Sequence, residues 1–487
     1  MSSVNNDELK KSAFNGVAWK FAERICAQGV SLVVSIILGR MLMPDDYAVV
    51  AVVALFFSFC NLFISCGLPT ALLQKKNPEP GDYSTVFYTN MVLAVTLYFL
   101  IFFAAPIIAD IYDIVLLVPI FRVMGLSFFI DAYKSVLGTY TYSNLQFKKF
   151  FFSTIIGTSI SAAVGIAMAI KGFGAWALVA QEMTNSFIDM VILYLSTRFK
   201  VGREFSVTRL KELFGYSWKL ATSSFITVVY DQINPLIIGL RYSPVDLSYY
   251  SKGNSFPSLI NSTLSDTMAS VLLPVMAKVQ DNKEDILNIT RRYVKVASYV
   301  IFPVMMGLYA VADSFIELLL TEKWLPAVPF VRIYCISFMF NLLQVGNLQA
   351  IKAIGRSDVI LKLEILKKSL YIFVIASFVF LSPSAEVMAF NVNACAVVGV
   401  TLNTLASRKL IGYFYRLQFV DFLPNLLMAV AMGVLVMLVG KLSLPLLVLL
   451  PVQVVAGAAI YVVFSLVTRN ENFYYLFDYI KTMLKRG

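Results

Sequence analysis

The feature that most constrains this chain is a succession of long apolar segments from one end to the other. A membrane-spanning helix needs roughly 20 mostly apolar residues, and the sequence contains about fourteen segments of that kind. They lie near 14–38, 46–67, 84–108, 114–140, 151–170, 174–196, 212–240, 246–275, 296–320, 327–351, 363–381, 385–407, 421–440 and 444–467. Of the 487 residues, 59% are hydrophobic and 14% are charged, whereas soluble domains average about 45–50% apolar and about 25% charged residues. The sequence therefore predicts an all-α integral membrane protein with about 14 transmembrane helices.

The loops between these segments indicate the orientation. If the N-terminus is cytoplasmic, the inner loops contain most of the lysines and arginines, while the outer loops contain little more than Arg40, Lys171, Arg241, Lys323 and Lys441. This is the positive-inside pattern, and it alternates correctly only for an even number of spans. We expect both termini to be cytoplasmic and the first span to be retained. The net charge of +11 then reflects topology, and nucleic-acid binding is not expected because the basic residues are scattered over short loops.

One pattern occurs twice. Gly39, Pro44 and Asp46 in "LGRMLMPDDYAVVA" reappear 200 residues later in "IGLRYSPVDLSYYS". Both copies follow the first span of a group of six, which predicts a parallel internal repeat. We expect two six-helix lobes around a central cavity, at residues 1–200 and 201–410. Residues 411–487 would add two membrane helices and an amphipathic tail lying on the inner membrane surface.

The segments "LGRMLMPDDYAVVAVVALF", "GLPTALLQKK", "LFGYSWKLATS" and "YDQINPLIIG" resemble the polysaccharide transporter (Wzx-type) oligosaccharide flippases of the multidrug/oligosaccharidyl-lipid/polysaccharide exporter superfamily. The motif residues are Gly39, Arg40, Pro44, Asp46 and Tyr47; Ala48 stands where the family usually has glycine. The resemblance implies transport of undecaprenyl-diphosphate-linked oligosaccharide from the cytoplasmic to the outer leaflet of a bacterial inner membrane. This transport would serve the biosynthesis of lipopolysaccharide O-antigen, capsule or exopolysaccharide, and the partners would be membrane lipids, a polysaccharide polymerase and export machinery.

A sugar-diphosphate head needs a hydrated, cationic path, and each charge within a span costs roughly 2.5–3.5 kcal/mol at a helix centre. Charged residues within the predicted spans are therefore the candidates for that path. As cationic substrate contacts we select Arg24, Lys134, Lys252 and Arg332. As coupling or charge-pair residues we select Glu23, Asp131, Asp231 and Asp266.

Several of these residues also have simpler interpretations. Glu23 could form a local ion pair with Lys20 or Arg24 that stabilises the first span, or Lys20 could reach the inner interface. Asp131 and Lys134 could neutralise each other. Asp231 precedes Pro235, and a proline inside a helix bends it and frees a carbonyl. Such interrupted helices line transporter sites, yet Asp231 could equally form a local hydrogen bond.

The chain contains no histidine and thus lacks the commonest metal ligand and general base. We expect no metal, no cofactor and no enzymatic activity. No GxxxxGK[ST] motif occurs, so ATP is not expected as the direct source of energy, and transport would be passive or coupled to protons or sodium. A related lipid II or multidrug exporter is one alternative function. A membrane polysaccharide polymerase or ligase is another, although the predicted outer loops are short for an enzyme that binds acceptor sugars.

Overall fold

The computed structural model describes residues 6–65, 67–75 and 78–486, and within these ranges it contains helices and no strand. The chain divides into two compact units, residues 1–248 and residues 249–487. The predicted all-helical class is confirmed. The repeat boundaries near residues 200 and 410 stay a prediction.

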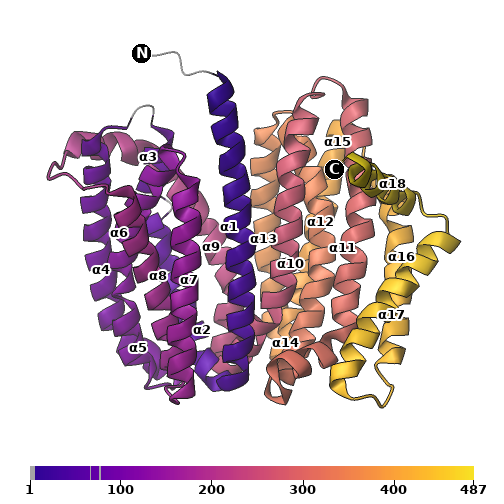
Figure 1. The fold of residues 1–487 in the computed structure, drawn as a ribbon, viewed down its shortest axis with the longest axis horizontal. Coiled ribbons are helices and arrows are strands. Elements are labelled where there is room, and N and C mark those ends of the chain that lie inside the picture. The colour runs from indigo at the N-terminus through magenta and orange to yellow at the C-terminus, as the bar shows by residue number, and fades with distance from the viewer. Residues whose placement is uncertain (1–5, 66, 76–77, 487) are drawn as a thin grey trace. The chain divides into compact units, whose positions relative to one another are not determined.

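The helices of unit 1 have the indigo to magenta colours in Figure 1. They are α1 (Asn6–Met41), α2 (Pro44–Ser65), α3 (Leu68–Gln74), α4 (Pro80–Tyr112), α5 (Leu117–Met124), α6 (Ser127–Ser143), α7 (Phe147–Ile170), α8 (Ala175–Thr197) and α9 (Val207–Arg241). Helix α7 packs against both α1 and α8. Small residues permit this close packing, because a Cβ on Gly165 would lie 3.0 Å from Cβ of Gln181 on α8.

Helix α10 (Pro244–Ala277) begins at the end of unit 1 and continues into unit 2. The remaining elements are α11 (Lys283–Leu320), the 3₁₀ helix η1 (Glu322–Ala327), α12 (Val328–Ala353), α13 (Ser357–Leu381), α14 (Ala385–Ala389), α15 (Asn391–Ile411), α16 (Tyr415–Val439), α17 (Leu446–Val467) and α18 (Glu471–Arg486). Helix α11 is the centre of unit 2 and packs against α12, α16 and α17. In Figure 1, α18 lies crosswise to these long helices.

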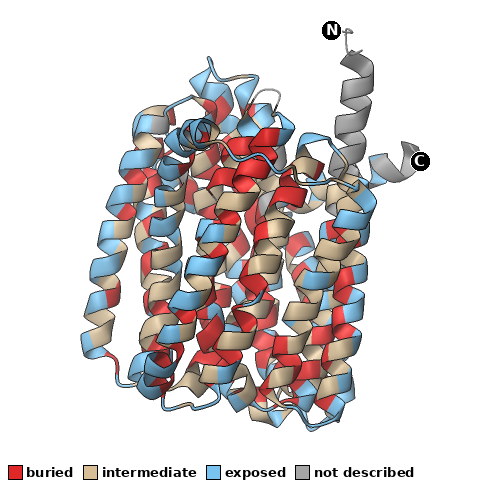
Figure 2. Ribbon diagram, turned by 90° about the vertical axis from the view of Figure 1, so that its left-hand side faces the viewer, coloured by how far each residue is buried: buried red, intermediate tan, exposed pale blue. Residues whose placement is uncertain are grey.

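Apolar side chains cover much of the surface of the long helices. On α4, Val92, Phe99, Phe103 and Ile107 are all more than half exposed, and their spacing of four and seven residues places them on one face. Figure 2 looks onto unit 1 and shows exposed and buried residues alternating along its helices. Among the described residues, nine helical segments are long and apolar enough to cross a membrane. The chain is therefore a multi-pass membrane protein, and the count of fourteen crossings stays a prediction.

Two predicted spans are interrupted in the structure. The segment 114–140 divides into α5 and α6 at Gly125, where a Cβ would lie 3.0 Å from the ring of Tyr98. The segment 385–407 divides into α14 and α15 at Phe390.

The predicted inner loop 276–295 is instead largely helical, because α11 already begins at Lys283. The Asn282 side chain caps this helix by accepting hydrogen bonds from the backbone N–H groups of Glu284 and Asp285. A polar stretch that resembles a loop in the sequence can thus be helical when a capping residue precedes it.

The repeated motif forms a helix start in both copies. At the start of α2, Asp46 Oδ2 accepts a hydrogen bond from the Met43 backbone N–H at 2.9 Å, and Pro44 takes the first helical position. At the start of α10, the Ser243 hydroxyl donates to Asp246 Oδ2 at 2.7 Å and accepts from the Asp246 N–H at 2.9 Å. Both arrangements satisfy backbone or side-chain groups at a helix N-terminus. Helix capping thus explains Pro44 and Asp46 in the first copy and Asp246 in the second.

Asp46→Ala should destabilise the protein by about 1 kcal/mol, because it removes the hydrogen bond that caps α2. Asp45→Ala is the matched control, since Asp45 lies in the same first turn and is exposed. Thermal unfolding of the purified variants in detergent measures the difference. An equal unfolding temperature for the two variants would contradict the capping role.

Candidate functional site

The main candidate site in unit 1 is a group of charged residues that we call the α6–α8 charge cluster: Asp131 and Lys134 on α6, and Glu182 and Asp189 on α8. The Lys134 ammonium lies 3.6 Å from Asp131 Oδ1 and 3.6 Å from Asp189 Oδ2. Glu182 interacts electrostatically with Asp131 and Lys134. All four residues retain some solvent exposure. Three acidic groups thus accompany a single lysine, and the cluster is acidic overall.

Half of this cluster was not recognised in the sequence. The predicted pair Asp131 and Lys134 is present, but Glu182 and Asp189 were missed. Their spacing of seven residues places them two turns apart on one face of α8. An acidic pair with helical spacing inside a predicted span was the available signal.

A second polar contact joins α1 to α7. Glu23 is buried, and its carboxylate accepts hydrogen bonds from Lys20 Nζ at 2.7 Å and from the Thr154 hydroxyl at 3.3 Å. The charge partner of Glu23 within α1 is therefore Lys20, one of the partners considered from the sequence. Arg24 is exposed.

Helix α7 brings these two polar regions toward each other. A Cβ on Gly157 would lie 3.4 Å from Cβ of Asp189, and Thr154 lies one turn earlier on the same helix. The α7 segment 154–157 therefore contacts Glu23 from α1 and Asp189 from α8. The absence of a side chain at Gly157 lets the cluster lie directly against α7.

Asp231 and Pro235 lie within α9. The helix is continuous across Pro235, from Val207 to Arg241, and Asp231 is exposed. The predicted bend of the helix axis at this proline stays a prediction. A coupling role for Asp231 stays a prediction.

In unit 2, the predicted cationic residues have different surroundings. Arg332 pairs with Asp313 and donates a 3.4 Å hydrogen bond to the Tyr309 carbonyl oxygen. Lys252 is buried, with its ammonium 5.5 Å from the centre of the Trp324 ring of η1. The side chain of Asp266 lies outside the described residues.

A set of ion pairs, which we call the unit 1 latch, joins α9 to the start of α4. The buried Asp82 carboxylate lies 3.0 Å from Lys75 Nζ and 3.3 Å from the Arg209 guanidinium, which also contacts Glu79 at 2.7 Å. Lys75 also pairs with Glu212 on α9 at 3.1 Å. The hydrogen bond to Glu79 and the charge of Asp82 raise the pKa of Arg209. The latch helps to explain why α9, which the repeat assigns to the second lobe, packs into unit 1.

Arg209→Ala should lower the unfolding temperature by several degrees, because Asp82 remains buried with one cationic partner fewer. Lys211→Ala, an exposed position on the same helix turn, is the control. Differential scanning fluorimetry in detergent measures both variants. Equal destabilisation by the two substitutions would argue against the latch.

The described residues contain no group of three His, Cys, Asp or Glu side chains that could hold a metal ion. The α6–α8 charge cluster instead has the elements of a site that exchanges partners. Its ion pairs are at 3.6 Å, longer than direct hydrogen bonds between charged groups. A lysine held in this way can contact another anion once one of the carboxylates is neutralised.

Solved structures with a similar fold extend over most of this chain. The structure matches the lipid II flippase MurJ with a TM-score of 0.70 at 15% identity, over 94% of this chain and 99% of that one. It also matches the eukaryotic MATE transporter AtDTX14 with a TM-score of 0.54 at 14% identity, over 86% of this chain and 99% of that one. The chain therefore shares its fold with these two proteins.

The profile of the family described as "Polysaccharide biosynthesis protein" matches residues 37–329, and the chain belongs to this family. It is 24% identical to the succinoglycan biosynthesis transport protein ExoT of Rhizobium meliloti, over 67% of this chain and 66% of that protein. It is 21% identical to the lipopolysaccharide biosynthesis protein WzxC of Escherichia coli, over 89% of this chain and 90% of that protein. The expected membership in the polysaccharide transporter family is confirmed.

Proposed function

We propose that this protein is a flippase that moves undecaprenyl-diphosphate-linked oligosaccharide from the cytoplasmic to the outer leaflet by alternating access. Family membership and the names of the transport-protein relatives support this proposal. The observation within the molecule that carries it is the α6–α8 charge cluster, which places a lysine and three acids on two helices of a membrane protein. Charges in such positions are costly and are typically retained for transport.

In the proposed mechanism, Lys134 exchanges carboxylate partners for the diphosphate of the cargo. Protonation of Asp131, Glu182 or Asp189 removes a negative charge that repels the diphosphate and frees the ammonium for it. Release of the proton restores the original ion pairs and displaces the diphosphate. Binding of the anion and binding of the proton would therefore favour each other.

Two further residues would assist this exchange. Arg24, which is exposed on α1, would provide a second contact to the diphosphate. Glu23, held by Lys20 and Thr154, would keep the adjoining turn of α1 in place. The membrane potential would assist outward movement of the anionic head by roughly 2.3 kcal/mol per charge per 100 mV.

The coupling is tested by the pH dependence of cargo movement. Flipping should accelerate as the pH falls, because protonation neutralises carboxylates that compete for Lys134. Asp189→Asn should flatten this dependence, whereas the exposed control Asp110→Asn should retain it. Fluorescently labelled lipid-linked oligosaccharide in proteoliposomes, followed over a series of pH values, measures both variants. A wild-type rate that is independent of pH would reject the coupling mechanism.

A further inference from the structure

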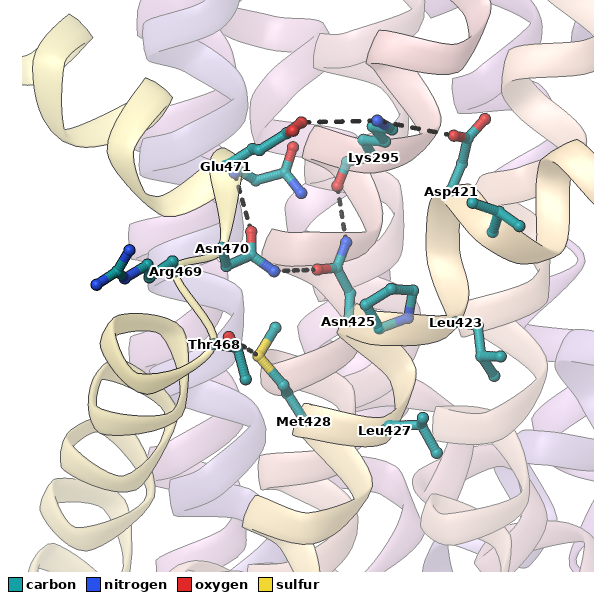
Figure 3. A pocket seen from close by; sticks show the side chains of 13 residues that line it. Lys295, Asp421, Leu423, Asn425, Leu427, Met428, Thr468, Arg469, Asn470 and Glu471 are labelled. Atoms are coloured by element: carbon teal, nitrogen blue, oxygen red, sulfur yellow. Dashed lines mark hydrogen bonds and ion pairs between the residues drawn. The ribbon is translucent and has the colours of Figure 1, made fainter.

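Unit 2 contains a pocket of about 590 Å³ that the proposed transport mechanism does not use. It lies among α11, the first turns of α16 and the turn between α17 and α18 (Figure 3). We propose that this pocket binds the headgroup of a phospholipid that carries phosphoethanolamine. The lipid would hold α18 against the rest of unit 2, whatever cargo the protein transports.

The polar side of the pocket is a preformed network of asparagines. Asn425 donates to the Lys295 carbonyl oxygen at 3.0 Å and to the Ser298 hydroxyl at 2.8 Å. Asn470 donates to Asn425 Oδ1 at 3.1 Å and accepts the Asn472 backbone N–H at 2.9 Å. These bonds hold the turn before α18 in position, so the pocket exists without a ligand.

One hydrogen-bond acceptor beside this network has no donor among the described residues. Asn472 is 6% exposed, and in the part of the chain that the structure describes its Oδ1 atom has no hydrogen-bond partner. A buried carbonyl oxygen without a donor costs roughly 1–3 kcal/mol. Asn472 lines the pocket beside Glu471, so a ligand with a cationic N–H donor would satisfy the acceptor and contact a carboxylate at the same time.

The turn after α17 places an arginine at the edge of the pocket. Arg469 has a φ of +47°, the left-handed conformation that ends α17, with the Asn470 N–H donating to the Ser465 carbonyl oxygen at 2.9 Å. Figure 3 shows its side chain pointing outward from the turn, away from Asn425. Arg469 is exposed and can offer its guanidinium to a phosphate at the mouth of the pocket.

The charges in the pocket match a zwitterion better than an anion. Asp421 is already occupied by two hydrogen bonds of 2.9 Å from Arg291, and Lys295 lies 3.7 Å from the exposed Glu471. A ligand can contact the cationic Arg469 on one side. On the other side it can contact Asn472 and the Glu471 carboxylate, which is 77% exposed although it pairs with Lys295. A phosphate next to a primary ammonium has the complementary arrangement.

The opposite wall shows why the ligand should be a lipid. Val420 and Leu427 on α16 line the pocket, and both side chains are more than half exposed. A polar recess beside exposed apolar side chains, at the end of membrane helices, fits an amphiphile whose headgroup lies at the membrane–water boundary. A soluble headgroup analogue would leave this wall uncovered.

The test measures the lipid that the full-length protein retains after purification and re-lipidation in equal mixtures of phosphatidylethanolamine and phosphatidylglycerol. Native mass spectrometry should show preferential retention of phosphatidylethanolamine by the wild type. Arg469→Gln should reduce that retention about tenfold, the effect of losing one charge-assisted hydrogen bond. Arg408→Gln, an exposed arginine at the end of α15, should retain the lipid as the wild type does.

A second variant separates recognition of the amine from recognition of the phosphate. Asn472→Leu should still bind phospholipid but lose the preference for phosphatidylethanolamine over phosphatidylglycerol. Equal retention of the two lipids by the wild type, or unchanged retention by Arg469→Gln, would overturn the proposal. Complete displacement of the lipid by soluble phosphoethanolamine would assign the pocket to a free ligand and would overturn it as well.

Discussion

Replacing Lys134 with alanine is expected to reduce export of surface polysaccharide by up to about 100-fold, since a charge-assisted contact is worth up to about 3 kcal/mol. The ammonium lies 3.6 Å from Asp131 and from Asp189. Without it, the cluster has acidic groups alone and repels the diphosphate of the cargo. Lys134→Arg should retain part of the activity, because it preserves the charge while changing its geometry.

The measurement is complementation of a strain that lacks the protein, with the amount of membrane-inserted protein determined in parallel. Lys171→Ala, an exposed lysine between α7 and α8, is the control and should export normally. Normal export by Lys134→Ala at a normal protein level would remove Lys134 from the mechanism.

Arg291→Met is expected to destabilise unit 2 by about 3–5 kcal/mol, the usual result of leaving one member of a buried ion pair without its partner. Arg291 donates two hydrogen bonds of 2.9 Å to Asp421, whose side chain is fully buried. The Tyr413 hydroxyl at 3.0 Å and Lys295 at 3.9 Å are the remaining contacts of that carboxylate. These two contacts replace only part of the stabilisation that Arg291 gives to the buried carboxylate.

The yield of monodisperse protein from size-exclusion chromatography measures this loss. The double variant Arg291→Met with Asp421→Leu should recover much of the yield, because no buried charge remains. Lys283→Met, an exposed position on the same helix, should match the wild type. A double variant that is as poorly folded as the single variant would show that the cost does not come from the unpaired carboxylate.

The sequence predicts the fold class well because lipid imposes simple rules. Long apolar segments must be helices, and the structure contains a helix in each of them, sometimes interrupted. The repeated Pro-x-Asp motif was also informative, since Asp46 and Asp246 each complete a helix start. Local chemistry of this kind depends on neighbours in sequence, so it can be recognised without a structure.

The candidate site was only partly predictable, because its residues come together through packing. Lys134 and Asp131 are one turn apart on α6 and were found by their spacing. Asp189 meets Lys134 only because α8 packs against α6. The latch between Asp82 and Arg209 likewise joins residues 127 positions apart, a distance over which no periodic pattern gives a signal.

The central claim is that this protein moves a lipid-linked oligosaccharide across a membrane through contacts made by Lys134. The most direct test is a flipping assay with purified protein in liposomes that contain undecaprenyl-diphosphate-linked oligosaccharide, in which a lectin reports the sugar exposed outside. The account predicts time-dependent exposure with the wild type and none above protein-free liposomes with Lys134→Ala. Equal exposure with both proteins, or none with the wild type, would contradict it.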